Sequence, residues 1–166
     1  MEILRSFEII SILLSIFTAL TETFSVIILM ITACLMWKQI REMRLTTYAG
    51  AFKATYDLLQ ADDVREARRV VLESLTNKAV EPWTVEERKA AEIVCSSYDA
   101  VGIMARNGMV PVEVVADSWG DSLRRTWKIL SPLVALYRAQ RNASEFWNEY
   151  EWLAKQAESH QKAVHI

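Results

Sequence analysis

Apolar residues dominate one long stretch near the start of the chain, and the few polar residues inside it are regularly spaced. Between Ile9 and Trp37 the only charged residue is Glu22. Seven polar positions in and beside this stretch follow one another at intervals of three, four or seven residues, which places them on one face of a helix. We call these seven residues the polar seam: Glu8, Ser11, Ser15, Thr18, Glu22, Ser25 and Thr32.

The apolar stretch is long enough to cross a membrane. Its 29 residues would reach roughly 43 Å as a helix, against about 30 Å of hydrocarbon in a bilayer. A cleaved signal peptide is the weaker interpretation, because it would have a basic start, a shorter apolar region and a small-residue cleavage site. We therefore expect an uncleaved transmembrane helix within residues 1–37.

Basic residues predict how this helix is oriented. Lys38, Arg41 and Arg44 follow the apolar stretch, whereas only Arg5 precedes it. The positive-inside rule then places the N-terminus outside and the rest of the chain in the cytoplasm. These charges predict a single-pass membrane protein with its C-terminal part in the cytoplasm.

Glu22 allows three interpretations. A carboxyl group at mid-membrane is costly and usually faces a helix bundle or water, so Glu22 could lie inside a homo-oligomer and line a pore. It could instead lie near the headgroups, if the membrane segment begins near Thr23 and residues 1–21 lie on the surface. It could also be protonated and inert.

The hydroxyl residues of the seam have two interpretations as well. Small and hydroxyl residues are typical of interfaces between membrane helices, but such hydroxyls also bond to the backbone of their own helix. We expect the seam to be the face on which copies of the chain associate.

The remainder of the chain is predicted to be all-α. The sequence has only four Gly and three Pro, and it shows no strand-like alternation of useful length. The transmembrane helix should continue to about residue 60, through a juxtamembrane connecting helix at 38–61, into a small cytoplasmic helical bundle at 62–166.

Local signals predict the first boundaries in this bundle. Asp62 or Asp63 should cap a helix that ends near residue 76. Thr84 and Glu87 have the spacing of a capping box for the next helix, which should end at the left-handed C-cap 107–108. The residues expected to face the core of these two helices are Val64, Ala67, Val71, Leu75, Ala90, Val94, Tyr98, Val101 and Ala105.

Two or three further helices should follow. We predict helices at about 112–118 and 121–141, separated by a bend at Trp119–Gly120, with a kink at Pro132. Ser144 should cap a last helix from 145 to about 160. Its inward face would consist of Phe146, Tyr150, Leu153 and Ala157.

No catalytic or metal centre is predicted. The only histidines, His160 and His165, lie near the end of the chain, and four glycines do not form a phosphate-binding loop. Cys34 and Cys95 are interpreted as small apolar residues in a reducing compartment. We therefore expect neither an enzyme nor a bound cofactor.

Arginines are the candidate ligand-binding residues. Their planar guanidinium groups suit phosphate, so a convergent set could bind an anionic nucleotide; the alternative is a solvated surface with local ion pairs. The bundle is neutral overall, which disfavours extended nucleic acid. The candidates are Arg65, Arg68, Arg69, Arg124, Arg125 and Arg138, with Arg141 beside them. For Asp99 we expect a salt bridge to Arg138 or Arg124.

The layout from Ile27 onward resembles a family of small bacterial membrane proteins with one N-terminal span and a helical cytoplasmic domain. The resemblance supports this architecture and implies no activity and no catalytic residue. It rests on Gln39-Ile40-Arg41, Trp83, Tyr98-Asp99, Gly102, Gly108, Trp119-Gly120, Trp127, Pro132, Arg138 and Trp147.

Two functions are compatible with the sequence. In the first, an oligomeric membrane protein senses or binds a ligand through its helical domain, and its span forms a pore or perturbs the membrane; by analogy this shape suits a bacterial defence effector. In the second, the chain is a membrane-tethered scaffold that docks a cytoplasmic protein, and the span only dimerises it.

Overall fold

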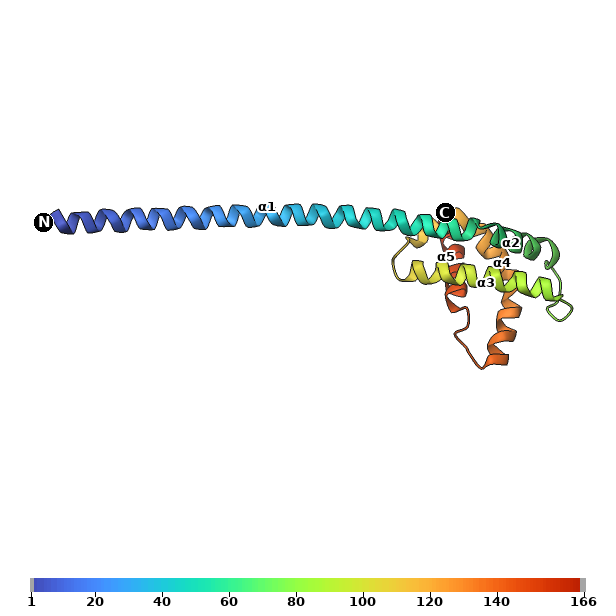
Figure 1. Cartoon of the computed structure of the whole chain (residues 1–166). Helices are drawn as coiled ribbons and strands as arrows, with labels where there is room; N and C mark the ends of the chain where they lie inside the picture. The colour runs from blue at the N-terminus through green and yellow to red at the C-terminus, as the bar shows by residue number, and fades with distance from the viewer. Residues whose placement is uncertain (1, 165–166) are drawn as a thin grey trace. The chain divides into compact units, whose positions relative to one another are not determined.

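The chain is built from helices alone throughout its described part. The computed structural model describes the backbone of residues 2–164 and the side chains of 14, 15, 17, 18, 20–43 and 46–163. No strand occurs in this part, so the predicted all-α class is confirmed. The helices are α1 (Glu2–Gln60), α2 (Asp62–Ser74), α3 (Val85–Arg106), α4 (Val112–Arg141) and α5 (Asn148–Val164) (Figure 1).

These helices form two compact units. Met1–Thr46 is the first, which we call the apolar unit, and Thr47–Ile166 is the second, which we call the bundle unit. Helix α1 therefore contributes its last residues to the bundle unit, where Ala51, Thr55 and Leu59 are buried. Phe52 and Tyr56 on the same segment lie 6.1 and 6.2 Å from the ring of Trp119.

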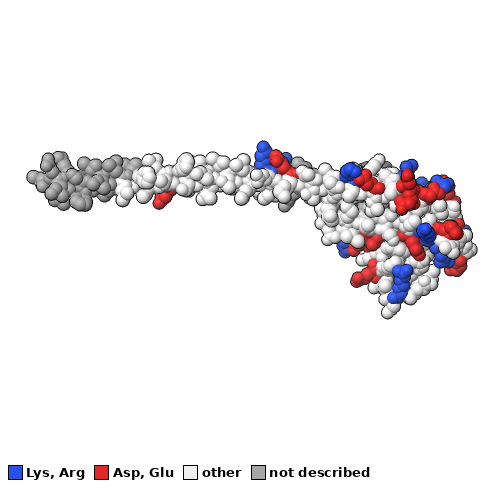
Figure 2. Space-filling view, viewed as in Figure 1, with Lys and Arg blue, Asp and Glu red and all other residues white. Residues whose placement is uncertain are grey.

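The apolar unit exposes large hydrophobic side chains. Phe24 and Leu29 are 65% and 68% exposed, and Figure 2 shows a long stretch of α1 that is almost free of charge. Within the described residues, α1 alone is long and apolar enough to cross a membrane. Because burying such surface is favourable, this unit requires an apolar environment that it does not provide itself.

The predicted core faces of α2 and α3 are confirmed, since all nine residues are buried. The capping box of α3 is also confirmed: the amide of Glu87 donates to Oγ1 of Thr84 at 3.2 Å, and the amide of Thr84 donates to Oε2 of Glu87 at 2.8 Å. Gly108 has φ +68° and ends the helix with a Schellman pair of bonds, as predicted.

The predicted side-chain cap of α2 is wrong. The helix begins at Asp62, its N-cap is Ala61, and no side chain caps it. Asp62 and Asp63 lie one position later, in the first turn. Two carboxylates there still interact favourably with the helix dipole, which explains why the sequence pattern resembled a cap.

The predicted bend at Trp119–Gly120 is wrong as well, because α4 continues through it. Both residues are buried. A Cβ at Gly120 would lie 3.2 Å from a guanidinium nitrogen of Arg124 and 3.7 Å from Cβ of Ala157 on α5. Gly120 is therefore a contact point between packed helices and not a turn.

The last helix begins later than predicted. Residues 144–147 form turns and α5 starts at Asn148, so Ser144 is not its cap. Instead, the amides of Glu149 and Tyr150 donate to Oδ1 of Asp99 on α3, at 3.0 and 3.1 Å. The expected salt bridge of Asp99 is thus wrong: this carboxylate binds backbone N–H groups at the start of a neighbouring helix.

Two more residues of α3 complete this junction. Gly102 approaches α5 so closely that a Cβ there would lie 2.5 Å from the carbonyl oxygen of Glu149. Arg106 donates to both carboxylate oxygens of Glu149 at 2.8 Å. We call the set Asp99, Gly102, Arg106, Glu149 and Tyr150 the α3–α5 junction.

Buried hydroxyl groups connect the centre of the bundle. Tyr98 donates to Ser122 and Tyr150 donates to Thr126, each at 2.7 Å. The two tyrosine rings stack with centroids 5.3 Å apart. Burial raises the pKa of the Cys95 thiol well above its usual range, which agrees with a core role for this cysteine.

Candidate functional site

A groove lies between the end of α2 and the middle of α4. Its volume is about 400 Å³, within the range of roughly 300–1,000 Å³ that is typical of small-molecule sites. Its lining contains apolar and polar residues and three basic side chains, and no acidic residue belongs to it. The lining consists of Leu72, Leu75, Thr76, Asn77, Lys78, Arg125, Lys128, Ile129 and Pro132.

The segment after α2 shapes one wall of the groove. Leu75 ends α2 and is buried, and Asn77 takes a left-handed conformation with φ +62°. The amide of Lys78 then donates to the carbonyl of Leu75 at 3.1 Å. Asn tolerates a positive φ better than most residues, so this reversal is encoded locally.

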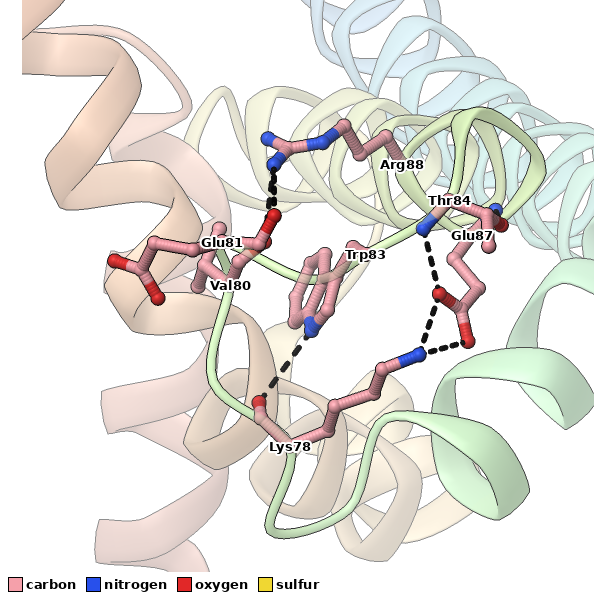
Figure 3. A network of polar contacts seen from close by, with 7 residues as sticks. All are labelled: Lys78, Val80, Glu81, Trp83, Thr84, Glu87 and Arg88. Carbon is pink, nitrogen blue, oxygen red and sulfur yellow. Dashed lines mark hydrogen bonds and ion pairs between the residues drawn. The ribbon is translucent and has the colours of Figure 1, made fainter.

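A network of polar contacts holds Lys78 in place (Figure 3). Its Nζ donates to both carboxylate oxygens of Glu87, at 2.7 and 2.8 Å. The indole of the buried Trp83 donates to the carbonyl of Lys78 at 3.4 Å, and Arg88 donates to the carbonyl of Val80 at 3.0 Å. The wall is thus fixed to the first turn of α3.

The three basic side chains of the groove differ in how far they are neutralised. The hydrogen bond from Lys78, followed by that from the backbone of Thr84, lowers the pKa of Glu87, so Lys78 has a full counter-charge. Arg125 is 3.6 Å from Asp121, which also pairs with Arg124. Lys128 has no ion-pair partner among the described residues. The groove therefore carries a net positive charge. Lys78 contributes less to this charge than Arg125 or Lys128 does.

Pro132 changes the hydrogen bonding of the opposite wall. It lies inside α4 and has no N–H, so the carbonyl of Lys128 lacks the bond that position 132 would ordinarily donate. A ligand in the groove could donate to this acceptor.

The structure divides the predicted arginines over several contacts. Arg69 pairs with Glu66 and Glu73, and Arg65 lies 3.9 Å from Asp62. Arg68 donates to the carbonyl of Leu59. Only Arg125 lines the groove, and a shared anion site for all six remains a prediction.

The other two arginines of the set contact α5. Arg124 donates to the carbonyl of Ala157 at 3.2 Å. Arg138 pairs with Glu151 at 2.7 Å and donates to the carbonyl of Phe146 at 2.9 Å. One nitrogen of its guanidinium, Nη2, is buried without a partner in the described chain. Both side chains thus hold α5 against α4.

Three hydroxyls of the polar seam bond to their own helix. Thr18 donates to the carbonyl of Ser15 at 2.9 Å, and Ser25 and Thr32 donate to carbonyls four residues earlier at 2.8 Å. Glu22 is exposed and has no polar partner among the described residues. Glu8 and Ser11 lie outside the described side chains.

Sequence reasoning did not find the groove lysines. Lys78 and Lys128 are isolated in the sequence, and the available signals were indirect: Asn77 as a chain reversal, and Pro132 as a gap in helical bonding.

In the described residues no group of His, Cys, Asp and Glu could hold a metal ion.

Comparison with protein families gives one match. The model of the family described as "Domain of unknown function (DUF4760)" matches residues 7–157. The chain belongs to this family. The DUF4760 match covers most of α1, all of α2 to α4 and most of α5, so both the apolar unit and the bundle unit belong to the family pattern. No curated protein and no solved structure matches the chain.

Proposed function

We propose that the chain is a single-pass protein of a bacterial inner membrane that self-associates along its polar seam and binds a ligand through its bundle unit. Its N-terminus would lie outside and its bundle unit in the cytoplasm, as the basic residues Lys38, Arg41 and Arg44 favour. The span would form a pore or perturb the membrane when copies assemble. No reaction is part of the proposal.

One observation carries this proposal. Glu22 is exposed in the apolar unit, where the described apolar side chains are exposed as well, and no other described residue partners its carboxyl group. A carboxyl group inside hydrocarbon costs several kcal/mol unless it meets protein or water. A second copy of the helix would supply a protein contact, because Glu22 lies on the same face as Thr18 and Ser25.

The test is the oligomeric mass of the full chain in nanodiscs. We expect a closed assembly of four or more copies for the wild type and a smaller assembly for Glu22→Leu. Thr23→Leu is the matched control, since it also replaces a polar residue but lies about 100° around the helix from Glu22. A monomeric mass for the wild type and for both variants would contradict the proposal.

The pore itself requires a second measurement. Single-channel recordings of wild type and Glu22→Gln in planar bilayers should differ in conductance or ion selectivity. Identical recordings would remove Glu22 from any conduction path.

A second function is favoured by the hydroxyl bonds within α1. The hydroxyls of Thr18, Ser25 and Thr32 each donate to a backbone carbonyl of their own helix. They therefore need no water-filled pore as a hydrogen-bond partner, and two copies of the helix could pack along the seam as a dimer. The chain would then be a membrane-tethered scaffold for a cytoplasmic protein. A single stoichiometric partner in a pull-down, together with intact liposomes, would favour this function over the first.

A further inference from the structure

The groove between α2 and α4 is, we infer, a binding site for a phosphate monoester that carries an apolar body. The inference deepens the proposed function and rests on it, because it names the ligand class of the bundle unit. Either a free nucleotide or the headgroup of phosphatidic acid would supply this chemistry. The argument rests on the charge, the shape and the composition of the groove.

The charge of the groove matches a dianion. Lys78 is neutralised by Glu87 at 2.7 Å, whereas Lys128 has no ion-pair partner in the described chain. Arg125 is 62% exposed and shares Asp121 with Arg124 at distances of 3.6 and 3.5 Å. Lys128 thus leaves one positive charge for a ligand, and the partly neutralised Arg125 leaves roughly half of one. A phosphate monoester carries about −1.5 to −2 at neutral pH, whereas a carboxylate carries only −1.

The two cations also have suitable geometry. Arg125 and Lys128 are three residues apart on α4, so they lie next to each other on one face of that helix. A guanidinium group binds two phosphate oxygens with its planar fork, and an ammonium group acts as a point charge. Neither side chain is needed for the core, so both can turn toward a ligand.

The remaining lining favours an apolar body attached to the phosphate. Leu72 and Leu75 belong to one wall, and Ile129 and Pro132 to the other. No described carboxylate belongs to the lining. Glu87 and Asp121 lie just outside it, and each is paired with a basic side chain of the groove. Inorganic phosphate alone would leave this apolar surface uncovered, and we expect it to bind more weakly than its organic esters.

The fixed wall lowers the cost of binding. Lys78 is held by Glu87, and Trp83 and Arg88 hold the adjoining backbone (Figure 3). Ordering of side chains is a main cost of association. With Lys78 held in advance, Arg125 and Lys128 are the basic side chains that lose freedom when the ligand enters.

The experiment is calorimetric titration of the full chain in an uncharged detergent. The probes are AMP, phenyl phosphate and dihexanoyl phosphatidic acid, with adenosine and inorganic phosphate as controls for the two halves of AMP. We expect at least one ester to bind, and both controls to bind at least tenfold more weakly. Raising the salt concentration should weaken the binding, because exposed charges are screened. AMP binding alone would indicate a free nucleotide, and phosphatidic acid binding alone a lipid headgroup.

Variants link this binding to the groove. Lys128→Met and Arg125→Met should each weaken binding roughly tenfold, the loss expected for one charged hydrogen bond. Lys89→Met is the matched control: Lys89 is an exposed lysine on α3 without an ion pair in the described chain, and it lies outside the groove lining. Its replacement should leave binding unchanged.

Two results would overturn the inference: no binding of any ester, or binding that is the same in Lys128→Met, Arg125→Met and wild type. The oligomeric mass of the same samples separates this failure from failure of the proposed self-association. If the chain is oligomeric but binds no ester, only the inference about the groove is refuted. If the chain is monomeric but binds an ester, only the proposed self-association is refuted.

Discussion

Oδ1 of Asp99 on α3 accepts a hydrogen bond from the backbone amide of Tyr150 on α5, across 3.1 Å. The same oxygen accepts the amide of Glu149 at 3.0 Å. The first turn of α5 therefore receives its cap from a residue about fifty positions earlier in the chain. This cap ties the end of the fold to its central helix.

Removing this cap should destabilise the bundle unit. Asp99→Ala leaves two amides of α5 without an acceptor, and we expect the free energy of unfolding to fall by about 1–2 kcal/mol, as for other lost caps. Denaturant unfolding of the full chain in detergent, followed by tryptophan fluorescence, measures the change. Asp57→Ala, which breaks only an exposed ion pair, should stay within about 0.5 kcal/mol of the wild type.

The stability contributed by Asp99 should depend on pH. Burial raises the pKa of the Asp99 carboxyl above its ordinary value of 3.8. The hydrogen bonds from the amides of Tyr150 and Glu149 lower this pKa, but the effect of burial is larger. The folded state then binds this proton more tightly than the unfolded state, so stability falls as pH rises from 3.8 through the raised pKa. The test compares the free energies of unfolding of the wild type and of Asp99→Asn at each pH. The wild-type value minus the variant value should decrease from pH 3.8 to just above the raised pKa of Asp99, and then stay constant. A difference that grows with pH would contradict the assignment.

Gly102 should not tolerate a methyl group. A Cβ at this position would lie 2.5 Å from the carbonyl oxygen of Glu149, and backbone cannot move aside as a flexible side chain can. We expect Gly102→Ala to cost about 1–3 kcal/mol. Gly50→Ala is the matched control, since nothing lies within 4 Å of its Cβ position; it should be neutral or stabilise α1 by up to about 1 kcal/mol.

The two members of the Tyr150–Thr126 hydrogen bond should respond unequally to removal. In Tyr150→Phe, Thr126 still donates to the carbonyl of Ser122 at 2.7 Å, so the loss should be about 1 kcal/mol or less. In Thr126→Val, the buried hydroxyl of Tyr150 loses its acceptor at 2.7 Å. We expect this second variant to lose about 1–3 kcal/mol, measured by the same unfolding assay. Equal losses would mean that Tyr150 finds another acceptor.

Local signals in the sequence predicted those parts of the fold that are decided locally. Thr84 and Glu87 form their capping box within four residues, and Gly108 ends α3 through its own backbone conformation. The core faces of α2 and α3 followed from helical spacing alone. These features require no knowledge of the rest of the chain.

Features that depend on distant contacts were predicted wrongly or not at all. Gly120 resembled a bend in the sequence, because its position beside Ala157 of α5 is visible only in the folded bundle. Ser144 was the best local cap for the last helix, but Asp99 on α3 supplies the cap instead. The groove combines residues from two helices, and neither Lys78 nor Lys128 carries a motif of its own.

The contrast between the two cysteines has a practical consequence. Cys95 is fully buried with a raised pKa, whereas Cys34 is exposed on α1, so a thiol reagent applied to the folded wild-type chain should modify one position only. Cys34 lies about 200° around the helix from Thr32, which is nearly opposite the polar seam. A bulky fluorophore attached there would point away from copies that meet along the seam, and energy transfer between labelled chains would report assembly without disturbing it. Efficient disulfide formation between Cys34 residues of two copies would instead place the contact on the other side of α1.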